Sequence, residues 1–243
     1  MKSIIINEKP AALNEIGGRS NNEDAIYPHI GKAEGNERIF MVCDGVGGAN
    51  KGEIASYLTC KTMSEFLSNK TDINPNDIKQ AIAYTEQAFD DYISQKPECK
   101  GMATTLAMLL INDNNCTIAW AGDSRIYHIR NRNIIFQSKD HSLINYLIDT
   151  GEIKPEEANN HPKKNIILKA LKGTEDPITP QIEIIENIMP DDLFLLCSDG
   201  VLENISNQNL KDICLPNKSE AEIKEEIFQR CQGNTKDNFS IYI

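Results

Sequence analysis

Four aspartates stand at the ends of short, mostly apolar runs of the kind that form buried strands. The run precedes the acid in three cases and follows it in the fourth, and the acids are Asp44, Asp123, Asp199 and Asp237. Strands of one sandwich can end at the same rim, so these carboxylates can converge in one cleft. Converging carboxylates repel one another unless a cation neutralises them. If the four carboxylates do converge, the chain must fold so that four distant strand ends meet.

Oxygen-rich sites that keep several waters suit Mg²⁺ or Mn²⁺. Two such ions that share one aspartate can hold a bridging water, lower its pKa and present hydroxide for in-line attack on phosphorus. The alternative for each single position is a plain turn, because Asp-Gly is a common turn pair and the chain carries 36 acidic residues. Spacing alone thus indicates a metal hydrolase as one option only.

Strand-like and helix-like segments come in blocks rather than in strict alternation. The expected strands cover 38–43, 102–111, 116–121, 125–130, 134–138, 181–188, 193–197 and 239–243. The four strands between 102 and 138 indicate an antiparallel meander. Expected helices cover 51–67, a segment opened by Asn74 and Pro75, 142–151, 206–214, and a segment opened by a Ser219/Glu222 capping box. Blocks of this kind favour an α+β sandwich over a parallel sheet.

Length and charge limit the classes of partner. A chain of 243 residues, 40% of them hydrophobic, can form one large domain with a sizeable core, and two small domains are the alternative. The formal charge of −11 opposes binding to nucleic acid or to an anionic membrane. The longest apolar stretch, 106–111, is too short to cross a bilayer. These features predict a cytoplasmic protein without nucleic-acid or membrane partners.

The cysteines argue against a disulfide framework. There are 7 of them, an odd number, and no two form a Cys-x-x-Cys pair of the kind that binds zinc. Several fall inside apolar runs. We therefore expect buried free thiols in a reducing compartment.

Seven or more motifs, in order along nearly the whole chain, resemble the metal-dependent serine/threonine protein phosphatases of type 2C, in their bacterial form. The motifs are Gly18 to Ala25 with its Arg19 and Glu23-Asp24, Val42 to Gly48, Gly52 to Ser56, Gly101 to Thr105, Ala121 to Tyr127, Asp140-His141-Ser142, His161-Pro162, Leu196 to Val201 and Lys236-Asp237-Asn238. One such motif is weak, but the ordered series is specific.

The resemblance implies a four-layer α-β-β-α sandwich, with two packed antiparallel sheets flanked by helix pairs. It implies one domain over residues 1–243 with a flap at about 142–171 that touches the substrate protein. It also implies two ions, Mn²⁺ or Mg²⁺, and a weaker third. By this resemblance Asp44 bridges the first two ions, Asp199 and Asp237 complete the first, and Glu23 with the Gly45 carbonyl serves the second. Asp123, with Asp199, holds the third ion. Arg19 binds the phosphate, because its planar fork suits that anion.

Supporting roles are expected for three further residues. Asp24 is expected to hold its neighbours by hydrogen bonds, and His141 and His161 at the flap edges to be structural.

Some family members carry histidine after the first Asp-Gly, where it can protonate the leaving group. Here that position is Val46, so a general acid worth about 10²–10⁴-fold is absent from that spot.

The implied function is metal-dependent hydrolysis of phosphoserine and phosphothreonine on proteins, opposing a cognate kinase, by a monomer. Two other readings stay open: a catalytically dead module that binds phosphoproteins, and a two-metal hydrolase of small phosphoesters or nucleic acid, the latter disfavoured by the charge. The chain ends six residues after Asp237, so regulation is expected from partners, expression or metal supply.

Overall fold

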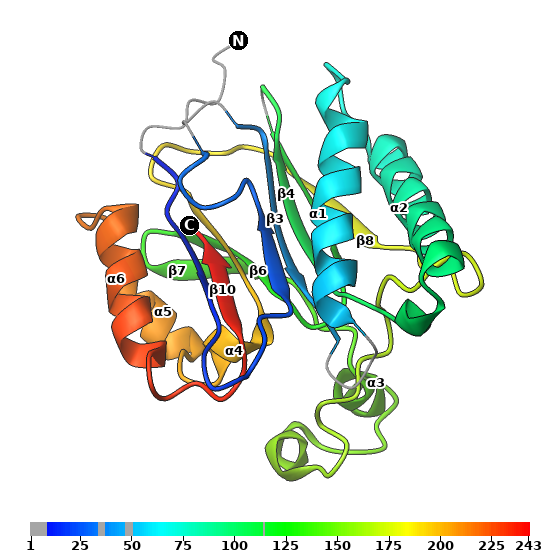
Figure 1. Cartoon of the computed structure of the whole chain (residues 1–243). Helices are drawn as coiled ribbons and strands as arrows, with labels where there is room; N and C mark the ends of the chain where they lie inside the picture. The colour runs from blue at the N-terminus through cyan, green and yellow to red at the C-terminus, as the bar shows by residue number, and fades with distance from the viewer. Residues whose placement is uncertain (1–8, 34–36, 47–50, 114) are drawn as a thin grey trace.

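Two antiparallel sheets of five strands each form the centre of the molecule (Figure 1). The computed structural model describes residues 9–33, 37–46, 51–113 and 115–243. The order in the first sheet is β1 (Ala12–Glu15), β10 (Phe239–Tyr242), β9 (Leu193–Cys197), β6 (Arg125–Arg130) and β7 (Asn133–Gln137). The order in the second sheet is β2 (Asp24–Tyr27), β3 (Ile39–Asp44), β4 (Leu106–Ile111), β5 (Cys116–Ala121) and β8 (Gln181–Ile185).

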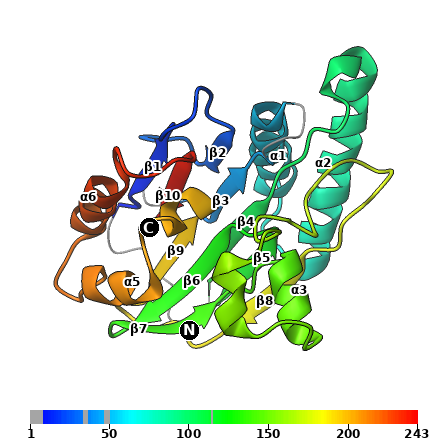
Figure 2. The same ribbon diagram turned by 90° about the horizontal axis from the view of Figure 1, so that it is seen from below.

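Helices cover the outer face of each sheet (Figures 1 and 2). The second sheet is covered by α1 (Gly52–Ser68) and α2 (Pro75–Gln95), and the first by α5 (Asn207–Ile213) and α6 (Glu220–Cys231). The shorter helices are α3 (Leu143–Asp149), α4 (Asp199–Leu202) and two 3-10 turns, Pro97–Cys99 and Pro155–Asn160. This is the α-β-β-α sandwich expected from the sequence.

The alternation of side chains along the strands builds three buried apolar layers between the four layers of helices and sheets. In β3, Phe40 and Val42 face the other sheet, whereas Met41 and Cys43 face α1 and α2, because successive side chains of a strand point to opposite faces. The Phe40 ring meets Tyr242 of the first sheet edge-on, with centroids 5.1 Å apart. Each large side chain buried in this way contributes about 2 kcal/mol. All seven cysteines are free and buried, as expected.

Helix starts follow their capping signals. The Asn74 side chain accepts from the backbone N–H groups of Asn76 and Asp77, and the Asp77 carboxylate accepts from the N–H of Asn74 at 2.9 Å. Ser219 and Glu222 form the same reciprocal arrangement at the start of α6. These predictions are confirmed. Strands β1 and β2 were not expected, since each has only four residues and lies next to polar sequence.

The predicted meander between 102 and 138 is wrong. The chain forms two hairpins, and they lie in different sheets: β4 pairs with β5 in the second sheet, and β6 pairs with β7 in the first. The chain crosses between sheets at Gly122, whose φ of +106° is strained for any residue with a side chain. The crossing leaves β5 to pair with β8 and β6 to pair with β9. Asp123 lies in this crossing.

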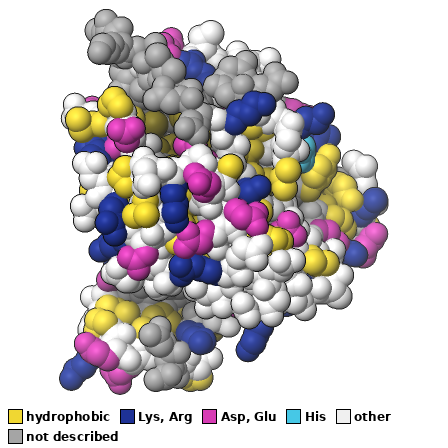
Figure 3. All heavy atoms as spheres, turned by 90° about the vertical axis from the view of Figure 1, so that its left-hand side faces the viewer, with side chains coloured by type: hydrophobic (Ala, Val, Ile, Leu, Met, Phe, Trp, Pro, Cys, Tyr) yellow, Lys and Arg dark blue, Asp and Glu magenta, His cyan; other side chains and the backbone are white. Residues whose placement is uncertain are grey.

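Two surface properties bear on partners. Within the described ranges, no helix combines the length and the apolarity that a bilayer crossing requires. On the face that carries α5 and α6, acidic and basic side chains are interspersed (Figure 3). The described part of that face therefore offers no continuous basic surface to a polyanion.

A buried carboxylate ties β6 to the start of β9. Asp192, whose side chain is 1% exposed, accepts from Arg130 Nε and Nη2, both at 2.6 Å, and from the backbone N–H of Met189 at 2.9 Å. Burial alone would raise the pKa of Asp192. The hydrogen bonds from Arg130 and Met189, with the nearby His128, outweigh it, so that pKa is lowered.

We expect Asp192→Asn to lower the free energy of unfolding by about 3 kcal/mol at pH 7, because it breaks a buried pair. Because the pKa of Asp192 is lower in the folded state, its charge stabilises the fold at pH values above the unfolded-state pKa of 3.8. That contribution is lost as the pH falls through the folded-state pKa. Urea unfolding at pH 7 and pH 3 should show the wild-type advantage shrinking at pH 3. Asp149→Asn, at an exposed ion pair with Lys139, should change stability by less than about 0.5 kcal/mol. An equal loss at both pH values would contradict the ion-pair account.

Candidate metal and phosphate site

Four strand ends bring the four predicted aspartates to one end of the sandwich. Asp44 ends β3, Asp123 follows β5, Asp199 follows β9 by two positions, and Asp237 precedes β10 by two. Their charges act on one another: Asp44 is influenced by Asp199, Asp123 and Asp237, in addition to the paired residue Asp24. The structure thus gathers side chains that are up to 193 positions apart in sequence, from 44 to 237.

Burial and mutual repulsion disfavour negative charge in this cluster. Burial, and then the charges of Asp24, Asp199, Asp123 and Asp237, raise the pKa of Asp44 well above its ordinary value. Burial and the charge of Asp199 raise the pKa of Asp123 to about 7. Burial and the charge of Asp237 raise the pKa of Asp199 to about 6. A cation between these groups would reverse this effect, because it favours the ionised form.

The donor set fits a hard divalent cation that retains water. The ligands on offer are all oxygens, and the buried Oδ1 of Asp123 has no hydrogen-bond partner among the residues that the structure describes. In the same part of the chain, no group of three or more His, Cys, Asp or Glu side chains is arranged so that it could hold a metal ion. Mg²⁺ and Mn²⁺ do not require a cage made of protein side chains alone, because they bind through one or two carboxylates and keep several waters.

Close backbone contact fixes the turn after Asp44. A Cβ on Gly45 would lie 2.5 Å from the carbonyl carbon of Gly52 at the start of α1 and 2.7 Å from the carbonyl oxygen of Glu23. The Gly45 N–H donates to that same Glu23 oxygen at 3.0 Å, and Ser56 Oγ donates to it at 2.6 Å. Glycine at 45 and 52 therefore lets β3, α1 and the Glu23 segment meet. Gly47 and Gly48 of the predicted motif lie outside the described ranges.

Two predicted site residues contact each other at the rim. Arg19 donates from Nε to Asp237 Oδ1 at 2.8 Å and from Nη2 to Oδ2 at 2.6 Å, with side chains 51% and 30% exposed. This is a fork-to-fork pair, the same geometry with which arginine binds phosphate. Arg19 is thus beside the acid cluster, with its fork directed at a carboxylate.

Glu23 is held through its backbone next to the cluster. Its N–H donates to Asn238 Oδ1 at 2.9 Å, while its carbonyl accepts from Gly45 and Ser56. Burial, and then the charge of Glu53, raise the pKa of its side chain. The Glu23 carboxylate therefore stands at the α1 side of the site.

Supporting hydroxyl groups surround the cluster, and sequence reasoning missed them. Thr105 Oγ1 accepts from the N–H of Asp44 at 3.0 Å, and Thr104 Oγ1 donates to the Asp44 carbonyl at 2.9 Å. Ser198 Oγ donates to Asp24 Oδ2 at 2.7 Å and links the two sheets. Asp24 supports its neighbours as expected, and burial raises its pKa to about 7. The signal in the sequence that could have indicated these residues is the presence of serine and threonine next to the strand ends.

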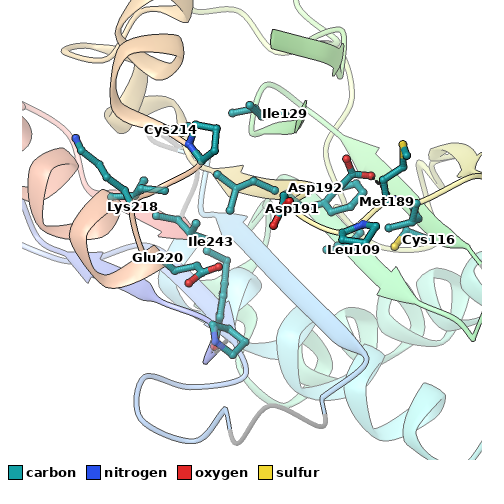
Figure 4. Close-up of a pocket in the computed structure, with 18 of the residues that line it drawn as sticks. Leu109, Cys116, Ile129, Met189, Asp191, Asp192, Cys214, Lys218, Glu220 and Ile243 are labelled. Atoms are coloured by element: carbon teal, nitrogen blue, oxygen red, sulfur yellow. Dashed lines mark hydrogen bonds between the residues drawn. The ribbon is translucent and has the colours of Figure 1, made fainter. Parts of the chain in front are cut away.

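A cavity lies at the other end of the sandwich. It has a volume of about 510 Å³. It is lined by the far ends of the same strands, including Ile111, Ile129, Leu193 and Tyr242. Met189 and Asp192, which Figure 4 labels together with Ile129, line it as well. Since β4, β6, β9 and β10 each reach the aspartate cluster with the opposite end, this cavity is separate from the candidate site.

The sequence pattern of the family described as Protein phosphatase 2C matches residues 15–236. The chain belongs to the protein phosphatase 2C family. The match includes six of the seven predicted site residues, Arg19, Glu23, Asp44, Gly45, Asp123 and Asp199, and stops one residue before Asp237.

Relatives and solved structures extend this protein phosphatase 2C assignment. The chain is 33% identical over 205 residues to the protein phosphatase PhpP of Streptococcus pneumoniae, covering 83% of this chain and 82% of that protein. It is 30% identical over 231 residues to the serine/threonine protein phosphatase PstP of Mycobacterium tuberculosis, covering 93% of this chain but only 42% of that longer protein. The crystal structure of PstP superposes with a TM-score of 0.84 at 29% identity over 96% of both chains.

The contact between Gly45 and Gly52 can be tested by adding one methyl group. We expect Gly45→Ala to lower the free energy of unfolding by about 2 kcal/mol or more, because the new Cβ overlaps rigid backbone. Chemical denaturation measures this, and calorimetric titration with Mn²⁺ should show weakened binding. Gly31→Ala is the control: Gly31 has a φ of +75° and open space around it, so only strain of about 1 kcal/mol arises. Wild-type stability of Gly45→Ala would rule out the close contact.

Proposed function

We propose that this family member hydrolyses phosphoserine and phosphothreonine on proteins in a metal-dependent reaction. The observation that carries the proposal is the convergence of Asp44, Asp123, Asp199 and Asp237 with Arg19 at their rim. Membership of the protein phosphatase 2C family and the names of its relatives support the same activity. The crystallised catalytic domain of PstP is in complex with two manganese ions, which supports Mn²⁺ or Mg²⁺ as the cofactor.

The residues that would hold the ions follow from the family pattern. Asp44 would be shared by two ions, Asp199 and Asp237 would complete the first, and Glu23 with the Gly45 carbonyl would serve the second. Asp123, with Asp199, would bind a weaker third ion, and this role is favoured by its Oδ1, which has no hydrogen-bond partner in the described part of the chain. Bound divalent cations would supply charge neutralisation and an activated water as nucleophile.

The chain's own residues position these groups and bind the substrate anion. Thr104 and Thr105 fix the backbone of Asp44 from both sides. Arg19 presents a half-exposed planar fork that can exchange the Asp237 carboxylate for the phosphoryl oxygens of a substrate. Its fixed positive charge would then stabilise the charge that develops on those oxygens during transfer.

The remaining predictions about organisation and partners belong to the same proposal. We assign residues 1–243 to one domain whose flap, residues 142–171, contacts the substrate protein. The substrates would be phosphoproteins made by a cognate serine/threonine kinase, and the enzyme would act as a cytoplasmic monomer without nucleic-acid or membrane partners. The net charge of −11 supports the last point.

Replacing Asp44 tests the activity directly. We expect Asp44→Asn to reduce Mn²⁺-dependent hydrolysis of an aryl phosphate and of a phosphothreonine peptide by at least about 10²-fold. Without metal the variant should be at least as stable as wild type, because the wild-type carboxylate has a raised pKa and its charge opposes folding at pH 7. Phosphate release and thermal unfolding in EDTA measure the two effects.

The matched control is Asp91→Asn, at an exposed aspartate on α2, which should retain full activity. Wild-type turnover by Asp44→Asn would refute the assignment. A wild-type protein that binds phosphopeptide but releases no phosphate with Mn²⁺ would instead favour a dead binding module. Turnover confined to small esters would favour a small-molecule phosphoesterase.

The aliphatic side chain of Val46 predicts a further property. Because Val46 cannot titrate, we expect the acid limb of the pH–rate profile to lack a histidine ionisation and to be flatter than a histidine donor would give. Any ionisation near neutral pH should survive replacement of each of the four histidines, because we assign the proton donor to none of them. The profile is measured as kcat/KM against pH. Loss of an ionisation on changing one histidine would show that a histidine donates the proton.

A further inference from the structure

His141 contacts the turn that carries Asp123 through two hydrogen bonds in opposite directions. The Gly122 N–H donates to His141 Nδ1 at 3.2 Å, and the backbone N–H of His141 donates to the Gly122 carbonyl at 2.8 Å. Gly122 is buried and immediately precedes Asp123. The imidazole therefore satisfies a backbone donor that water does not reach, next to a candidate metal ligand.

The same residue forms one side of the neck of residues 142–171. The Leu168 N–H donates to the His141 carbonyl at 2.7 Å, and the Leu143 N–H donates to the Ile166 carbonyl at 2.9 Å. Ser142 and Ile167 form a bridge between these bonds. The two sides of the neck are thus joined to each other at the residue that is joined to Gly122.

Neighbouring contacts fix the same junction. Asp140 accepts from Arg125 Nε and Nη2, both at 2.7 Å, so the residues on both sides of the Asp123 turn are held by the pair Asp140-His141. Trp120 Nε1 donates to the Lys139 carbonyl at 3.0 Å. Burial, and then the charge of Lys169, lower the pKa of His141. A neutral ring with a free Nδ1 lone pair is the form that can accept from Gly122.

We propose that His141 is a positioning residue that joins residues 142–171 to the Asp123 turn, so that the flap and the candidate third-metal ligand keep one fixed relative geometry. Its acceptor atom Nδ1 carries this role, and the effect on catalysis rests on the proposed function. The hydrogen bond itself does not depend on the proposed function, so it can be measured in the protein without metal or substrate.

The test compares substitutions that differ in where they place an acceptor. Asparagine puts its amide oxygen close to the position of Nδ1, glutamine puts it near Nε2, and leucine has none. In His141→Leu we expect the amide hydrogen exchange of Gly122 to accelerate about tenfold, because one buried hydrogen bond is lost. His141→Asn should stay close to wild type, and His141→Gln should resemble His141→Leu. If His141→Leu destabilises the whole fold, the comparison of His141→Asn with His141→Gln still decides the point.

Kinetics then show whether the junction serves the reaction. In His141→Leu and His141→Gln we expect a several-fold higher KM for a phosphothreonine peptide, because the flap is displaced. We also expect a several-fold higher Mn²⁺ requirement with an aryl phosphate, because Asp123 is displaced. Both should return to wild-type values in His141→Asn. His161→Leu is the control, because the hydrogen bond that His161 Nδ1 accepts comes from the nearby Lys163 N–H within the flap, so Gly122 exchange should not change.

The outcomes separate cleanly. Unchanged Gly122 exchange in His141→Leu, or equal acceleration in His141→Asn and His141→Leu, would overturn the proposed junction. Faster Gly122 exchange with a change in only one of the two kinetic parameters would overturn the coupling between flap and Asp123. If wild type itself releases no phosphate, the proposed function fails, while the exchange experiment still tests the junction.

Discussion

The mutual repulsion of carboxylates held at one end of the sandwich is the constraint on which the rest of the structure depends. Asp44, Asp123 and Asp199 have raised pKa values because they are partly withdrawn from water and face one another. Such a group costs free energy at neutral pH, and the fold must offset it elsewhere. The three buried layers supply that offset, since they bury side chains such as Phe40, Trp120 and Tyr242. The strands deliver the acids because their apolar residues have to be buried.

Holding the acids at fixed separations requires the two sheets to be joined behind them. Ser198 Oγ donates to Asp24 across the sheets and accepts from the N–H of Ser240, which relates β2 to β9 and β10. Thr105 and Ser124 share a hydrogen bond of 2.7 Å between their hydroxyl groups. These are buried polar bonds with defined geometry, and they fix register where packing alone permits sliding. The candidate site therefore owes part of its geometry to serine and threonine hydroxyl groups.

The sequence was most informative where one local rule acted alone. The strands that lead to Asp44 and Asp199 are almost entirely apolar, and the caps at Asn74 and Ser219 are satisfied by neighbours in sequence. It failed where tertiary contact decided the result. The crossing at Gly122 turned an expected meander into two hairpins in different sheets, because strand periodicity does not say which edge a strand will pair with. The pairing of Arg19 with Asp237, across 218 positions, was likewise outside any local pattern.

The two ends of the sandwich show why burial alone does not identify the site. Asp192 is almost completely buried, yet its pKa is lowered, because Arg130 and the Met189 N–H donate to both of its oxygens. Asp123 has an oxygen with no donor among the described residues, and its pKa is raised to about 7. The pKa of a buried aspartate thus shifts up or down according to the hydrogen-bond donors that surround it. A buried aspartate without a donor is a candidate for chemistry rather than for structure, which is why the acid end, and not the cavity beside Asp192, is the candidate site.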